Sequence, residues 1–256
     1  MPLLPDARPP EGLRIYAIGD VHGCVDKLTE IYGWIEEDLA RHPAIDWRLV
    51  HLGDYVDRGP DSNACVEAVM TRVLDRRVYA LCGNHEMQFL DFLGQADAET
   101  FHNWITYGGT QTMQSYGVEL GGEPVYGAFD DLKARAALRE NLIGQVPQSH
   151  LSFLTTLPYI LRFGDFVFVH AGVRPGIDID DQAPRDLVWI REPFLSSVED
   201  FGAVIVHGHT PQREVIMRPN RIGLDTGAVY GGPLSCLVLE GAERALLGEG
   251  GRRLLG

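Results

Sequence analysis

The chain of 256 residues is 45% hydrophobic and 23% charged, an ordinary globular composition that supports one sizeable core. Its 22 basic and 36 acidic residues give a net charge of −14, which argues against a basic surface for nucleic acids. The sequence shows no signal-peptide pattern, no run of 18 apolar residues and no paired-cysteine motif. We therefore expect a single cytoplasmic domain over residues 1–256 with neither a membrane nor a nucleic-acid partner, and the oligomeric state stays open.

Strand-like and helix-like segments alternate in the first third of the chain. Short apolar runs predict strands at residues 13–18, 47–52 and 78–82. Apolar residues at helical spacing predict helices at 25–40 and 63–74. This alternation is typical of a largely parallel sheet whose strands are connected by helices.

The stretch from residue 87 to residue 144 departs from this rhythm. It contains helix-like pieces separated by glycine pairs such as Gly108-Gly109 and Gly121-Gly122, and it is too long for a plain loop. We interpret it as a helical insertion near the mouth of the site that selects the substrate. The pieces lie at 87–93, 101–105, 110–116 and 131–143, and a further helix at 149–157 has Ser149 as its expected N-cap.

The second half of the chain is richer in strands. Segments 159–163 and 166–170 flank Gly164-Asp165, which predicts a β-hairpin. The tail from Gly241 is rich in glycine and arginine, and we expect it to fray. Further strands are predicted at 203–206, 214–218, 221–224 and 234–239.

Side chains able to bind metal follow five of the predicted strands. Oxygen and nitrogen ligands without sulfur suit manganese, iron or zinc better than calcium, and a neighbouring arginine suits phosphate. Spacing alone allows either His207 or His209 to be the last ligand. The segments are Gly19-Asp20-Val21-His22-Gly23, Gly53-Asp54-Tyr55-Val56-Asp57-Arg58-Gly59, Gly83-Asn84-His85-Glu86, His170, and His207-Gly208-His209.

Taken together, these motifs resemble the signature of the calcineurin-like metallophosphoesterases, from Asp20 to about Tyr230. They are most similar to the phosphoprotein-phosphatase branch, and residues 104–117 resemble the insertion of its bacterial members. The resemblance implies an α/β fold in which two mixed β-sheets pack as a sandwich flanked by helices. It also implies two divalent metal ions, for which manganese is our first expectation and iron or zinc the alternatives. A carboxylate that bridges two ions holds them roughly 3.5–4 Å apart.

The resemblance further implies a role for each motif residue. Asp57 would orient His85, the general acid. Arg58 and a second arginine would grip the phosphoryl oxygens; Arg191 is the better match, and Arg174 is its competitor. The metal ligands would be Asp20 and His22 for the first ion, Asp54 as the bridge, and Asn84, His170 and His209 for the second.

The expected activity is hydrolysis of phosphomonoesters by a serine/threonine protein phosphatase acting on a phosphoprotein or a small phosphoester. The alternative is a symmetrical bis(5'-nucleosyl)-tetraphosphatase. Gly23-Cys24 resembles the end of the first motif of that branch. Pro211 stands where the wider superfamily often has a second histidine, which favours the protein-phosphatase branch. A metal-bound module without catalysis is disfavoured, because the proton donor is intact.

Several neighbouring residues receive structural interpretations. We expect Glu86 to accept hydrogen bonds from local backbone groups rather than to bind metal, and His207 to be structural. Tyr230 is equally consistent with an active-site tyrosine and with a wall residue. Trp104, Trp189 and Tyr116 are expected to serve packing.

Overall fold

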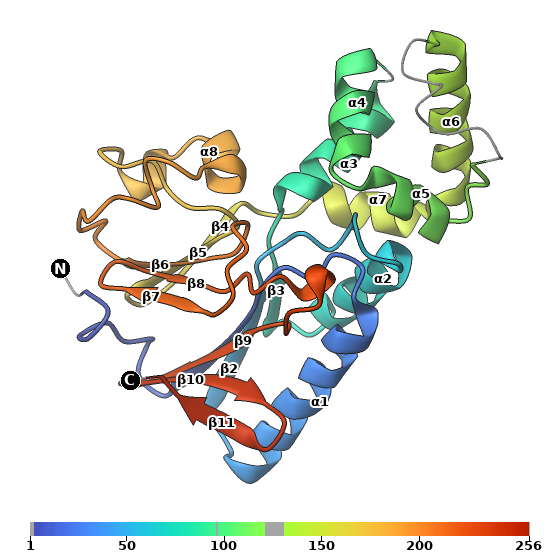
Figure 1. Cartoon of the computed structure of the whole chain (residues 1–256). Coiled ribbons are helices and arrows are strands. Elements are labelled where there is room, and N and C mark those ends of the chain that lie inside the picture. Colours follow the sequence, from blue (N-terminus) through green and yellow to red (C-terminus); the bar gives the residue numbers. More distant parts are fainter. Residues whose placement is uncertain (1–2, 96, 121–130, 256) are drawn as a thin grey trace.

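The computed structural model describes residues 3–95, 97–120 and 131–255, and it contains two mixed β-sheets (Figure 1). The first sheet has the order β11-β10-β9-β1-β2-β3, in which β1, β2 and β3 are parallel and β9 runs antiparallel to β1. Its strands are β1 (Leu13–Ile18), β2 (Asp46–His51), β3 (Val78–Ala80), β9 (Cys236–Glu240), β10 (Glu243–Gly248) and β11 (Gly251–Leu254).

The second sheet has the order β4-β5-β6-β8-β7. β4 and β5 form the predicted hairpin, while β5, β6 and β8 are parallel. The strands are β4 (Ile160–Phe163), β5 (Phe166–Val169), β6 (Val204–His207), β7 (Ile216–Arg218) and β8 (Arg221–Gly223).

The two sheets pack face to face around an apolar core. Alternate residues of β1 point to opposite faces of the sheet, so Ile15 and Ala17 join Phe166 and Phe168 of the other sheet. Tyr16, between them in the sequence, belongs instead to the core under the helices. The expected α/β sandwich is confirmed, while the assignment of residues 1–256 to one domain stays a prediction.

Helices cover the first sheet and build a separate lobe. Helices α1 (Val25–Arg41) and α2 (Ser62–Val73) share a core with β1 and β2. The lobe lies beyond them, at the upper right of Figure 1. It comprises α3 (Asn84–Gly94), α4 (Ala98–Thr106), α5 (Gly109–Ser115) and α6 (Leu132–Gln145), next to α7 (Gln148–Thr155). The helical insertion is therefore confirmed, and the Gly121-Gly122 break lies outside the described residues.

Three local expectations were wrong or incomplete. Helix α7 begins at Gln148 with Pro147 as its N-cap, so Ser149 lies inside the helix and does not cap it. The tail does not fray: β10 and β11 pair with each other, and β10 pairs with β9. Helix α8 (Pro184–Trp189) was not anticipated, because its six residues are too few for a periodic pattern.

The reason for the ordered tail is a partly buried ion-pair network. Arg252 of β11 donates to Asp38 at 2.8 and 2.9 Å and to Glu240 at 2.9 Å, and Arg14 of β1 also contacts both acids. Sequence composition gave no sign of these partners, since they come from α1 and β9. Among the described residues, no helix is both long and apolar enough to cross a membrane.

Candidate active site

The loops that follow β1, β2, β3, β5 and β6 converge at one edge of the sandwich. Parallel strands bring their carboxyl ends to the same edge, which is where open α/β sheets bind ligands. Five residues of these loops have a positive φ without being glycine: 43° at His22, 55° at Asp54, 71° at Asp57, 69° at Arg58 and 65° at His209. Such backbone conformations are uncommon and unfavourable, and they cluster where a structure fixes side chains for function.

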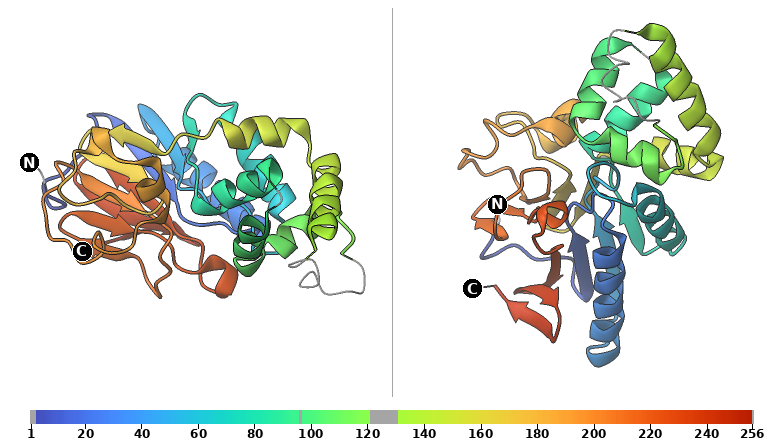
Figure 2. Two further views of the ribbon diagram at one scale, coloured as in Figure 1. Left: turned by 90° about the horizontal axis from the view of Figure 1, so that it is seen from above. Right: turned by 45° about the vertical axis from the view of Figure 1, so that its right-hand side comes forward.

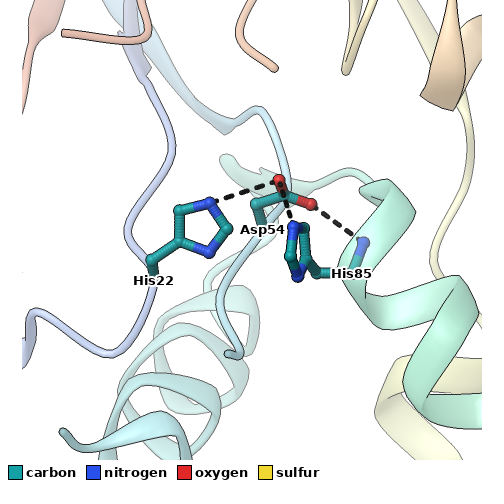
Figure 3. Close-up of side chains that lie close together, drawn as sticks. All are labelled: His22, Asp54 and His85. Atoms are coloured by element: carbon teal, nitrogen blue, oxygen red, sulfur yellow. Dashed lines mark hydrogen bonds and ion pairs between the residues drawn. The ribbon is translucent and has the colours of Figure 1, made fainter. Parts of the chain in front are cut away.

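Asp54 lies at the centre of the cluster (Figure 3). Its Oδ2 is 3.3 Å from His170 Nε2, 3.5 Å from His22 Nε2 and 3.9 Å from His85 Nε2. Its Oδ1 accepts the backbone N–H of His85 at 3.1 Å. Two groups able to hold a metal ion therefore share this carboxylate: His22, Asp54 and His85, and Asp54, His170 and His209.

The surroundings of His170 fit a cation. Its Nδ1 lies 2.9 Å from the Leu52 carbonyl, which fixes Nδ1 as the protonated nitrogen. Its Nε2 then faces two acceptors, Asn84 Oδ1 at 3.0 Å and Asp54. Although burial lowers the pKa of His170, the Asp54 carboxylate outweighs it and raises that pKa to about 10. Either a proton or a metal ion can satisfy these acceptors, and a carbonyl-bound imidazole is the usual arrangement of a metal-ligating histidine.

Three buried atoms of the cluster have no hydrogen-bond partner among the described residues. They are Asp20 Oδ1, His85 Nε2 and His209 Nε2. Asp20 is 3% exposed, and burial raises the pKa of its carboxyl well above the ordinary value, with Asp225 adding to the effect. Its other oxygen accepts the backbone N–H of His209 at 2.9 Å. Unpaired buried polar atoms demand an explanation, and a bound cation would supply one for Asp20 Oδ1 and His209 Nε2.

Asn84 completes this side of the cluster. Its Oδ1 lies 2.8 Å from His209 Nδ1 as well as beside His170. All six residues predicted as metal ligands are thus brought together, and the structure places each of them as buried.

His85 and Asp57 form a second arrangement beside the first. His85 Nδ1 lies 2.7 Å from Asp57 Oδ2, and both side chains are at most 1% exposed. Burial raises the pKa of Asp57 to about 7, against the hydrogen bond from Thr112. Burial also lowers the pKa of His85 to about 4, against the attraction of Asp54. Burial therefore favours a neutral pair that shares one proton across this contact.

The insertion holds Asp57 from the other side, which the sequence did not reveal. Trp104 Nε1 donates to Asp57 at 3.0 and 3.1 Å, and Thr112 Oγ1 donates to it at 2.5 Å. Trp104 also stacks on Phe89 and Phe92, so the packing role expected for it is only part of its contribution. The available signal was that a buried indole N–H needs an acceptor.

The arginines differ in their surroundings. Arg58 is half-buried, donates to His22 Nε2 at 2.8 Å and lies 5.9 Å from the Tyr230 ring. Arg191 is exposed, and its charge contributes to lowering the pKa values of His85 and His209, after burial. Arg174 instead pairs with Asp186 at 2.5 and 2.6 Å.

Glu86 and His207 lie where the sequence analysis expected them. Glu86 accepts the backbone N–H groups of Asp54 at 2.8 Å and Tyr55 at 2.7 Å, so it fixes the loop that carries the central carboxylate. His207 packs against Phe194, with ring centroids 5.1 Å apart.

Two aromatic side chains border the cluster. Trp189 was expected to be a packing residue, but it is only half-buried, and its ring lies 6.1 Å from that of His209. Tyr107, at the end of α4, lies 6.2 Å from His85 and 6.1 Å from Trp189. Tyr230, 66% exposed, stands on the Arg58 side.

Comparison with known proteins identifies similar sequences and folds. The model of the calcineurin-like phosphoesterase family matches residues 13–237. The asymmetrical bis(5'-nucleosyl)-tetraphosphatase PrpE of Anoxybacillus flavithermus is 30% identical over 245 residues, which cover 86% of this chain and 88% of that protein.

Solved structures share the fold at lower sequence identity. A candidate diadenosine tetraphosphatase superposes with a TM-score of 0.61 at 23% identity, covering 93% of this chain and 95% of that one. A cold-active protein-tyrosine phosphatase from a Shewanella species gives a TM-score of 0.56 at 18% identity, covering 99% and 84%. At these identities the likeness concerns the fold.

Proposed function

The chain belongs to the calcineurin-like phosphoesterases and is a metal-dependent hydrolase, and we propose that it cleaves dinucleoside tetraphosphates at a centre of two divalent ions. The observation that carries the proposal is the position of Asp54, whose Oδ2 lies 3.3 and 3.5 Å from His170 and His22. A carboxylate between two sets of imidazoles is the arrangement needed to bridge two ions. The proposed ligands are Asp20, His22, Asp54, Asn84, His170 and His209, and manganese is the first choice of metal.

The bound ions would supply a metal-activated hydroxide and neutralise charge on the phosphate. The protein's own groups provide the remaining steps. Arg58, and Arg191 rather than the paired Arg174, bind phosphoryl oxygens through their planar guanidinium groups. As the oxygen of a water that has lost one proton to solvent bonds to phosphorus and the bond to the leaving oxygen breaks, His85 Nε2 would give its proton to that leaving oxygen.

The Asp57–His85 pair supports this proton transfer. The 2.7 Å contact at Nδ1 holds the imidazole, and Nε2, which lies 3.9 Å from Asp54 Oδ2 and has no hydrogen-bond partner among the described residues, would face the substrate. The negative charge of an arriving phosphate favours the protonated imidazole, which opposes the effect of burial. Substrate binding would therefore raise the fraction of His85 that carries the proton.

Two observations bear on the substrate. The relative with 30% identity over most of both chains is named as an asymmetrical tetraphosphatase, which supports a dinucleotide. The motif Gly53–Gly59 with Gly83–Glu86 resembles protein phosphatases, so a serine/threonine phosphatase is the second candidate. Four free cysteines, three of them buried, agree with our proposal of a cytoplasmic protein.

A substrate panel on the manganese-loaded protein tests the proposal. Diadenosine tetraphosphate is compared with phosphoserine, phosphothreonine and phosphotyrosine peptides, and products are separated by chromatography. We expect preference for the dinucleotide and formation of ATP plus AMP. Two molecules of ADP would establish the symmetrical alternative, and preference for a phosphoserine or phosphothreonine peptide would establish the second candidate. Activity that persists after chelation would overturn the metal centre.

A further inference from the structure

A cavity of about 210 Å³ opens beside the cluster, between helices α3, α4 and α8. The right-hand view of Figure 2 shows α8 next to this part of the helical lobe. The cavity adjoins the cluster around Asp54, since Gln88 in its lining lies one turn after His85 on α3. Trp189, on its other side, has its ring 6.1 Å from that of His209. Its volume is below the roughly 300–1,000 Å³ of pockets that enclose a drug-sized ligand, so it suits a single ring system.

Gln88 gives the cavity its chemical character. The side chain is 8% exposed, and its Oε1 has no hydrogen-bond partner within the described part of the chain. A buried acceptor without a donor is unfavourable, and native structures seldom keep one without a ligand or water. The Asp91 carboxylate lines the same cavity and adds a second acceptor. The cavity therefore calls for a ligand that donates hydrogen bonds.

The remaining lining suits a flat, neutral ring attached to a phosphate. Trp189 and Met87 offer an aromatic and a thioether surface, against which a planar ring can stack. Arg185, also in the lining, places a positive charge there that suits a phosphate and disfavours a cation. Arg185 and Trp189 lie on α8, and Arg191 follows two positions after the end of this helix. This segment therefore connects the cavity to the cluster around Asp54.

We propose that this cavity binds a nucleobase carrying an exocyclic amine, such as adenine, with Gln88 Oε1 accepting from the amine. The inference deepens the proposed function and rests on it, because it assigns one base of a dinucleotide a place beside the general acid. A lysine or arginine of a phosphopeptide would also donate hydrogen bonds, and it would be attracted by Asp91 but repelled by Arg185. That alternative is an outcome of the experiment.

The decisive comparison uses ligands that differ at one position of the ring. In inosine, a carbonyl replaces the amine of adenosine, so an acceptor would face Gln88 Oε1. We expect AMP to bind the metal-free protein roughly tenfold more tightly than IMP by calorimetry. With the manganese-loaded protein, kcat/KM for diadenosine tetraphosphate should exceed that for the diinosine compound by a similar factor.

The variant Gln88→Met keeps the size of the side chain and removes the acceptor. It should abolish the adenine-over-hypoxanthine preference in both measurements. Gln95→Met makes the same change at an exposed glutamine that follows α3, and it should keep the preference. A general loss of structure would instead weaken the binding of AMP and IMP equally. The ratio of the two dissociation constants would then stay at its wild-type value.

Each result has one meaning. Equal binding of AMP and IMP by the wild type, or a preference that survives Gln88→Met, would overturn the base site. A different result is that a basic residue next to the phosphoserine of a peptide increases kcat/KM in the wild type but not in Gln88→Met. That result would show that the cavity binds a cationic side chain and not a nucleobase. If the protein hydrolyses p-nitrophenyl phosphate but shows no preference between the adenine and hypoxanthine ligands, the proposed metal centre stands and only this inference is refuted. Base preference in binding without any hydrolysis would support the cavity and refute the proposed reaction.

Discussion

Trp104 donates its indole N–H to Asp57 at 3.0 Å, although the two residues lie 47 positions apart. Asp57 in turn contacts His85 at 2.7 Å, so a helix of the insertion is two contacts away from the proposed proton donor. The insertion thus does more than border the site: it donates hydrogen bonds to the carboxylate that contacts the imidazole of His85. A change in the α4–α5 region can therefore reach the reaction without touching substrate.

Trp104→Phe tests this connection, since it keeps an aromatic ring next to Phe89 and Phe92 and removes the N–H, together with one ring of the indole. We expect about a tenfold fall in kcat for an alkyl phosphate, whose leaving oxygen needs a proton, and a smaller fall for p-nitrophenyl phosphate. Tyr116→Phe is the matched control, because it removes a hydroxyl that bonds to His150 rather than to Asp57. Equal losses on both substrates would argue against a positioning role.

His85→Asn removes the proposed general acid. We expect kcat to fall on the order of 10²–10⁴-fold for substrates with poor leaving groups, because their leaving oxygen then departs without a proton. Steady-state kinetics on an alkyl phosphate and on p-nitrophenyl phosphate measure the effect. Unchanged turnover of the alkyl phosphate would exclude His85 from this role.

Asp54→Asn tests the carboxylate that we propose bridges the two ions. Loss of one negative oxygen between His22 and His170 should reduce metal occupancy as well as activity, because the two proposed ion sites share this residue. Elemental analysis after dialysis gives the number of ions per chain. Asp186→Asn, which removes an acid paired with Arg174 on the surface, should keep the wild-type number. Two ions retained in Asp54→Asn would contradict the assignment.

Arg191→Ala distinguishes the two candidate phosphate clamps. We expect KM for a phosphoester to rise about tenfold or more, because charge-assisted hydrogen bonds to the phosphoryl oxygens are lost. Arg174→Ala should leave KM near the wild-type value, since the Arg174 guanidinium is engaged by Asp186. The reverse pattern would transfer the role to Arg174.

Asp38→Asn tests the ion-pair network that orders the tail. Burial raises the pKa of Asp38, but the hydrogen bonds from Arg252 and Tyr16 outweigh it and hold that pKa below 3.8. A lowered folded-state pKa stabilises the protein above about pH 4, and the contribution disappears as the pH falls through the folded-state value. The variant should therefore lower the free energy of unfolding at pH 7 by on the order of 3 kcal/mol.

Urea unfolding between pH 7 and pH 3 measures this difference, which should shrink below pH 4. Glu37→Gln is the control, because its pair with Arg41 is exposed on both sides and should contribute at most about 1 kcal/mol at any pH. A deficit for Asp38→Asn that is as large at pH 3 as at pH 7 would show that packing, not charge, is responsible.

Much of this molecule follows from local pattern. Alternating apolar runs located β1, α1, β2 and α2 to within about two residues, because strand and helix periodicities depend on neighbours in the sequence. The polar residues at five strand ends were sufficient to propose a shared edge, since parallel strands bring these ends together. In the same way, Glu86 was correctly expected to bind backbone groups.

The sequence by itself thus indicated the insertion from its local pattern, and its resemblance to a known family implied the sandwich and the set of residues that meet around Asp54. Only the tertiary structure decided which distant groups pair: Trp104 with Asp57 and Arg252 with Asp38. It also leaves Gln88 Oε1, in the cavity lining that includes Trp189, without a hydrogen-bond partner among the described residues. The physical reason is that periodicity specifies which face of an element is apolar. The partner of a buried polar atom depends instead on which elements pack together, and no local pattern encodes that choice.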